Sequence, residues 1–178
     1  MIGERLKTAM NDQVRNELES YYIYLSMAAW LHSRSLDGMA HWMRCQAHEE
    51  MIHAMKFFDH IIDRGGKVVL QDLRQIKTDW TSPLEIWEDT LAHEQFISGK
   101  INDLTSIARE EKDYAAEPML AWFSKEQIEE EATAGKVLDQ IKMAGTHQGG
   151  IMFLDRELGA RAFPPGSPID PVAYAQAT

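Results

Sequence analysis

The sequence contains little cysteine, no long hydrophobic run and no excess of basic residues. Its 178 residues include one cysteine, Cys45, which excludes an intrachain disulfide, a zinc ribbon and a Cys-x-x-Cys redox pair. No run approaches the roughly 18 apolar residues that span a membrane. The first residues, Met-Ile-Gly-Glu-Arg, lack an apolar stretch of signal-peptide length, so we expect a cytoplasmic protein. The formal net charge of −10 argues against nucleic acid as the main partner and permits cations.

Apolar residues recur at helical spacing along most of the chain, and glycine and proline interrupt this pattern. Gly65-Gly66 is a good helix stop, and Ser82-Pro83-Leu84-Glu85 is typical of a capping box with proline at the first helical position. The expected helices cover residues 4–33, 39–64, 83–112 and 118–144, with a short fifth helix at about 151–158.

These lengths predict an all-α four-helix bundle with one long crossover and a short C-terminal helix. The four main helices exceed the usual length of about 11 to 12 residues, which is typical of bundles. The first and third connections are short and join antiparallel neighbours, whereas the middle one is long enough to run along the bundle. We expect a single domain over residues 1–162. Residues 163–178 hold four of the six prolines and are expected to form an extended or mobile tail.

Each long helix carries a glutamate near the middle of its apolar face: Glu17, Glu50, Glu94 and Glu130. A lone glutamate on a helix usually faces water, but here that explanation must apply four times, each time on the apolar side. An ionised carboxylate buried without a partner costs several kcal/mol. The four groups could instead share protons as acids with raised pKa values. Two divalent cations would balance the four negative charges more simply, so we expect a dimetal site.

The spacing Glu50-x-x-His53 places two ligands one helical turn apart, where both can bind one metal. Imidazole with carboxylate oxygens suits iron or manganese, with zinc as a competitor. Dimetal carboxylate bundles use a glutamate from each of two helices and Glu-x-x-His from the other two. This chain has three of these four elements, because its fourth helix carries Gln127-x-x-Glu130.

Over about residues 4–160 the sequence resembles the non-haem bacterial ferritins. The motifs that carry the resemblance are Glu17, Glu49-Glu50-x-x-His53, Glu94 and Glu126-Gln127-x-Glu129-Glu130. The resemblance implies a ferroxidase, which oxidises Fe(II) with O2 or peroxide and stores ferric mineral inside a cage of 24 subunits. Fe(II), the oxidant and copies of the same chain are therefore the expected partners, without nucleic acid or membrane.

The resemblance also implies how two irons would be held. Glu17, Glu50 and His53 would bind the first iron. Glu94 and Glu130 would bind the second, with Glu50 bridging the two. Gln127 would be a weak partner near the second iron.

A third iron position and a redox tyrosine are further implications of the resemblance. Glu49, Glu126 and Glu129 would form the third position. Each precedes a residue of the inner face and turns the same way from the core, although three surface charges would show the same pattern. Tyr24 lies two turns from Glu17 on the same face and would serve the redox step. A core tyrosine with a satisfied hydroxyl explains it equally well.

Four interpretations other than a non-haem ferritin were considered for this sequence. A bacterioferritin would bind haem between subunits through a methionine, and Met51 lies where that residue would be; an interface or surface methionine is the simpler interpretation. A dimetal oxidoreductase that stores nothing is the second alternative, and a metal-free structural bundle is the third. A mini-ferritin is disfavoured by the within-subunit site and the fifth helix. The remaining six histidines fall off the inner faces and are expected at the surface or at interfaces.

Overall fold

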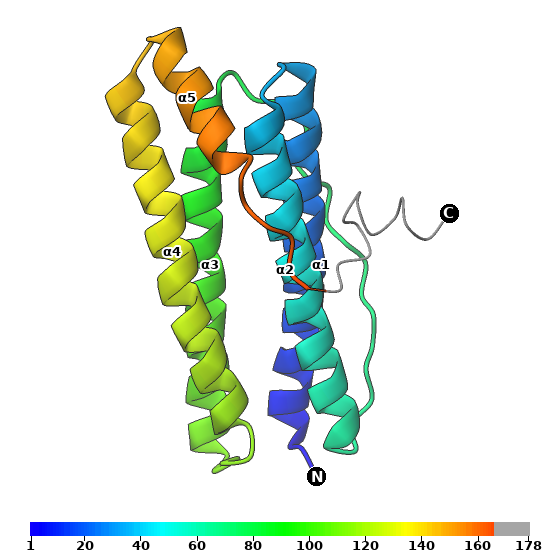
Figure 1. Ribbon diagram of the computed structural model, residues 1–178. Helices are drawn as coiled ribbons and strands as arrows, with labels where there is room; N and C mark the ends of the chain where they lie inside the picture. Colours follow the sequence, from blue (N-terminus) through cyan, green and yellow to red (C-terminus); the bar gives the residue numbers. More distant parts are fainter. Residues whose placement is uncertain (166–178) are drawn as a thin grey trace.

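The computed structural model describes residues 1–165, which form five helices (Figure 1). Their bounds are α1 Glu4–Ser33, α2 Asp37–Asp63, α3 Pro83–Glu110, α4 Glu117–Ala144 and α5 Gln148–Leu158. The four long helices form a bundle, and α5 packs against α2 and α4 at one end. No strand occurs over residues 1–165, and the predicted all-α bundle with a short fifth helix is confirmed. Of the expected tail, residues 166–178 lie outside the described residues.

None of the helices described within residues 1–165 has the length and apolar character needed to cross a membrane.

The helix ends follow local rules that were partly visible in the sequence. The Ser82 hydroxyl caps α3 by accepting a hydrogen bond from the Glu85 amide at 3.2 Å, as expected. The Glu85 carboxylate does not close the capping box; it accepts at 2.7 Å from the amide of Thr81 instead. Helix α5 begins three residues before the predicted 151, because Nδ1 of His147 accepts from the Gly150 amide at 3.1 Å.

The crossover between α2 and α3 runs along α1 for most of the length of the bundle (Figure 1). Polar side chains of α1 bind it at successive heights, so its backbone is held without secondary structure of its own. The strongest of these contacts is the ion pair of Glu19 with Arg74. The other pairs are Asn11 with Lys67 and Val69, Arg15 with Gln71, Ser26 with Lys77, and Trp30 with Asp79.

The apolar core is divided into two clusters. One lies at the end of the bundle near α5 and includes Leu31, Met43 and Trp87; the other lies at the opposite end and includes Leu6 and Phe57. Between them, the middle of the bundle contains buried polar side chains: Glu17, Gln46, Glu50, His53, Glu94 and Gln127. The fold therefore places its chemistry in a polar belt, held from both sides by close-packed side chains.

Candidate metal centre

The first half of the site lies between α1 and α2. Glu17, Glu50 and His53 each offer one ligand atom, and these atoms lie within 4.8 Å of one another. All three side chains are buried, and His53 Nδ1 lies 3.4 Å from Glu50 Oε2. The predicted one-turn spacing of Glu50 and His53 thus turns both side chains toward Glu17.

The second half joins α3 and α4. Gln127 Nε2 donates to Glu94 Oε2 at 3.1 Å and to the Glu94 carbonyl at 3.2 Å. The Tyr24 hydroxyl donates to the other oxygen of the Glu94 carboxylate.

One amide connects the two halves. Gln46 Nε2 donates to Glu50 Oε1 at 3.1 Å and to Glu130 Oε2 at 2.9 Å. Glu130, which is partly exposed, is thereby placed beside Glu50, as a bridging role for Glu50 requires. Gln46 was not among the site residues predicted from the sequence.

Burial raises the pKa of three of the four carboxylates, so these groups ionise less readily in the metal-free protein. Burial, reinforced by the charge of Glu50, raises the pKa of Glu17 to about 8. The same two causes raise the pKa of Glu130 to about 7 and hold the pKa of Glu94 well above its ordinary value. These groups therefore carry protons that a cation would replace.

Glu50 and His53 behave as an ion pair inside this cluster. Burial opposes the charge on both, but the hydrogen bond between them and their mutual attraction outweigh it. The pKa of His53 rises to about 10, and the pKa of Glu50 falls below its ordinary value. In the absence of metal, the imidazolium is thus the internal cation of the site.

The donor set fits a divalent cation. Glu17 Oε1 accepts from Gln13 Nε2 at 2.8 Å, whereas Glu17 Oε2 is buried and has no hydrogen-bond partner among the described residues. Such an orphaned buried oxygen is costly unless a ligand satisfies it. Several carboxylate oxygens with one imidazole suit iron or manganese, and zinc as a competitor.

The residues expected at a third position are not gathered in the same way. Glu49 pairs with Arg161, and Glu129 lies 3.7 Å from the ammonium of Lys125. Within residues 1–165, the close ligand group contains none of Glu49, Glu126 and Glu129. The third position therefore stays a prediction.

Two of the histidines expected at the surface or at interfaces are buried or partly buried within the subunit. His48 is buried, and His93 packs its ring edge-on against Tyr24, with centroids 5.9 Å apart. His93 Nε2 lies 2.7 Å from the Ser20 hydroxyl, whose single hydrogen is donated to the Asn16 carbonyl at 3.0 Å. Nε2 of His93 is therefore the donor. Burial lowers the pKa of His93, so its ring is neutral near pH 7.

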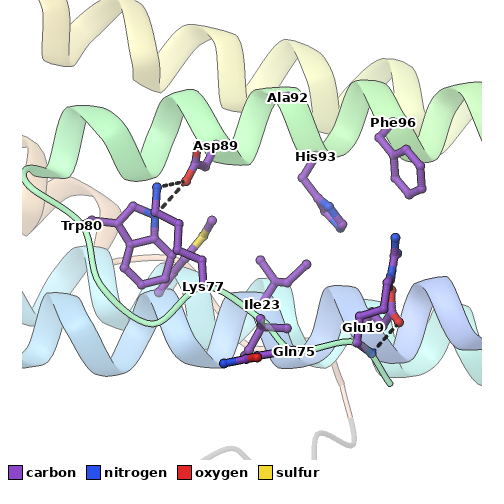
Figure 2. Close-up of a pocket in the computed structure, with 12 residues that line it drawn as sticks. Glu19, Ile23, Gln75, Lys77, Trp80, Asp89, Ala92, His93 and Phe96 are labelled. Carbon is purple, nitrogen blue, oxygen red and sulfur yellow. Dashed lines mark hydrogen bonds and ion pairs between the residues drawn. The ribbon is translucent and has the colours of Figure 1, made fainter. Parts of the chain in front are cut away.

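The imidazole of His93 also reaches a surface pocket of about 460 Å³ between α1, α3 and the crossover (Figure 2). Asp89, Lys77 and Trp80 are hydrogen-bonded together along its wall, with the Lys77–Asp89 bond at 2.8 Å. The glutamates of the metal site do not line this pocket.

Several supporting residues were missed in the sequence, and some left a signal. Gln13 precedes Glu17 by four residues and Gln46 precedes Glu50 by four, so each amide lies one turn from the carboxylate it binds. Arg161 left no such signal, because it follows the last helix.

Comparison with known proteins shows the family of the chain. The model of the ferritin-like domain family matches residues 7–144. The chain belongs to the ferritin family. It is 42 % identical over 161 residues to a bacterial non-heme ferritin of Bacteroides fragilis, covering 90 % of this chain and all of the relative. A bacterial non-heme ferritin of Staphylococcus epidermidis is 35 % identical over 163 residues, with 92 % and 98 % of the two chains covered.

Solved ferritin structures have the same fold. The open-pore ferritin of the hyperthermophilic archaeon Archaeoglobus fulgidus superposes with a TM-score of 0.89 at 39 % identity, covering 91 % of this chain and all of that one. The resemblance to non-haem bacterial ferritins inferred from the motifs is confirmed, and the haem-binding alternative is not favoured. Met51, the candidate haem ligand, is partly exposed on α2.

Proposed function

We propose that this ferritin stores iron and is a ferroxidase, using O2 or H2O2 to oxidise Fe(II) at the centre within each subunit. The observation that carries the proposal is the buried cluster of Glu17, Glu50 and His53, with one carboxylate oxygen unpartnered. In a purely structural bundle, burying these groups would cost free energy that no bound cation offsets. The ferritin names of the relatives support iron as the cargo.

In this proposal, Glu17, Glu50 and His53 bind the first Fe(II). Glu94 and Glu130 bind the second, and Glu50 bridges the two. Binding requires deprotonated ligands, so protons leave the glutamates and the His53 imidazolium as iron enters. Two Fe(II) then supply two electrons, which with two protons reduce O2 to H2O2 or reduce H2O2 to water.

The surrounding residues hold these ligands in place. The Gln46 and Gln127 amides keep Glu50, Glu130 and Glu94 turned inward. The Tyr24 hydroxyl binds Glu94, so in this proposal the tyrosine both positions a ligand and lies close enough to take part in electron transfer. The ferric product would accumulate in a cage of 24 subunits in the cytoplasm.

The first experiment adds excess Fe(II) in air to the metal-free protein. Size-exclusion chromatography with light scattering follows, and iron and protein are quantified in the same peak. Iron far above about three per chain in a very large particle supports storage. Saturation at about two per chain in a small oligomer would instead indicate a dimetal oxidoreductase that stores nothing.

A matched pair of variants tests the site. Glu94→Gln removes a ligand of the second iron, while Glu88→Gln removes an exposed carboxylate from the same helix. We expect Glu94→Gln to slow Fe(II) oxidation by at least tenfold and Glu88→Gln to leave it unchanged. Equal rates in the two variants would contradict the assigned site.

A further inference from the structure

The segment that follows α5 returns along α2 (Figure 1). Its backbone is fixed where the Arg161 carbonyl lies 2.7 Å from His41 Nε2. The Phe163 ring packs edge-on against His41 with centroids 5.0 Å apart, and the Arg44 guanidinium lies over the Phe163 ring. These contacts present the side chain of Arg161 to the middle of α2.

The Arg161 guanidinium contacts several side chains of α2 at once. It forms an ion pair with the Glu49 carboxylate and donates to Gln46 Oε1 at 2.9 Å. Its Cζ atom lies over the Trp42 ring, 4.3 Å from the ring centroid. The side chain of Arg161 is 22 % exposed and that of Glu49 is 30 % exposed, so solvent weakens this ion pair without abolishing it.

The same guanidinium determines which way the Gln46 amide points. Because Oε1 of Gln46 accepts from Arg161, its Nε2 must face the carboxylates of Glu50 and Glu130. Arg161 is therefore one residue away from two carboxylates of the metal centre, although it lies outside the bundle. Trp42 is buried beneath Arg161 and packs on Trp87.

We propose that Arg161 is a tethered cation that occupies Glu49 and competes with Fe(II) for that carboxylate. This inference rests on the proposed function, because it takes iron to be the cation that reaches Glu49. A cation bound at Glu49 meets the guanidinium as a like charge at contact distance, so Arg161 must move away. When Arg161 moves away, Gln46 Oε1 loses its hydrogen-bond donor. Because the Gln46 amide also holds Glu50 and Glu130, a cation bound at Glu49 affects how these two carboxylates are held.

Anaerobic calorimetric titration of Fe(II) into the metal-free assembled protein tests this. Arg161→Gln removes the competing charge but keeps a polar side chain. We expect it to tighten the weak class of Fe(II) sites about three- to tenfold. Arg156→Gln, an equal charge change at an exposed position of α5, should leave the weak class as it is in the wild type.

A double-mutant cycle with Glu49→Gln separates competition from general electrostatics. In the Glu49→Gln background, Arg161→Gln should have no further effect. Equal affinities for Arg161→Gln and Arg156→Gln, or an effect that persists without Glu49, would overturn the proposal. Absence of a weak class in both the wild type and Arg161→Gln would overturn it too.

Failure of the proposed function would look different. If the wild type lacks the two tight Fe(II) sites but Arg161→Gln still tightens a weak site, the ferroxidase centre is wrong and the role of Arg161 stands. Arg161→Lys is the second variant should Arg161→Gln fold poorly by circular dichroism. Lysine keeps the charge but lacks the planar fork that reaches Glu49 and Gln46 together, so it should tighten the weak class less than glutamine does.

Discussion

Replacing Glu17 by glutamine should stabilise the metal-free protein, and the gain should grow with pH. Burial raises the pKa of Glu17 from 4.5 to about 8, so the folded protein holds a proton that the unfolded chain releases. That contribution to folding is complete below pH 4.5 and is lost as the pH rises through about 8. At about 1.4 kcal/mol per pKa unit, the loss over this range is about 5 kcal/mol.

Glutamine has the shape of a protonated glutamate and cannot ionise. Its side-chain oxygen can accept the hydrogen bond that Gln13 now donates to Glu17 at 2.8 Å. The variant should therefore keep the fold while losing this part of the pH dependence. The difference in unfolding free energy between Glu17→Gln and the wild type should be small at pH 5 and reach several kcal/mol at pH 8.

The assay is urea denaturation with a chelator present, followed by circular dichroism at fixed protein concentration, because assembly also affects stability. Glu88→Gln, at an exposed position, is the control and should follow the wild type at both pH values. Added Zn²⁺ should reverse the order at pH 8 by stabilising the wild type alone. A difference that stays constant from pH 5 to pH 8, or that shrinks, would refute a buried, proton-holding Glu17.

Two further predictions concern packing and the redox step. A Cβ on Gly38 would overlap the Asp155 carbonyl oxygen, whereas a Cβ on Gly99, inside α3, meets nothing within 4 Å. In thermal unfolding, Gly38→Ala should destabilise the protein by about 1 to 3 kcal/mol, and Gly99→Ala should stabilise it by up to about 1 kcal/mol; equal shifts would contradict the close docking of α5. Tyr24→Phe removes the hydroxyl that donates a hydrogen bond to Glu94, and it should slow Fe(II) oxidation, followed by stopped-flow absorbance, by about tenfold. An unchanged rate would contradict this role of Tyr24.

The bundle and the main ligands could be predicted from the sequence because the apolar face of each long helix contains a glutamate. A helix packs through an apolar stripe, and a glutamate in the stripe contradicts that packing unless something binds it. Glu17, Glu50 and Glu94 each break a stripe, and all three are buried in the structure. The pattern of hydrophobic residues therefore located the belt without any knowledge of the fold.

Contacts that depend on the path of an irregular segment could not be read in this way. Arg161 follows the last helix, where no period relates its position to α2, yet it reaches Glu49. His93 lies about 100° around α3 from Glu94, which suggested the surface. The crossover covers that side of the bundle, and His93 reaches Ser20 beneath it. Neither contact was predicted, because both depend on chain segments that carry no helical signal.

The arrangement of the core explains how the fold tolerates so costly a centre. Two apolar clusters lie on either side of the polar belt, so the helices are held above and below the glutamates whether or not metal is bound. The His53 imidazolium and the protons on Glu17 and Glu130 limit the negative charge in the metal-free state. Iron would replace these protons rather than organise the bundle. Because packing holds the ligands in place and protonation stabilises the metal-free site, we expect the bundle to stay folded when metal is removed.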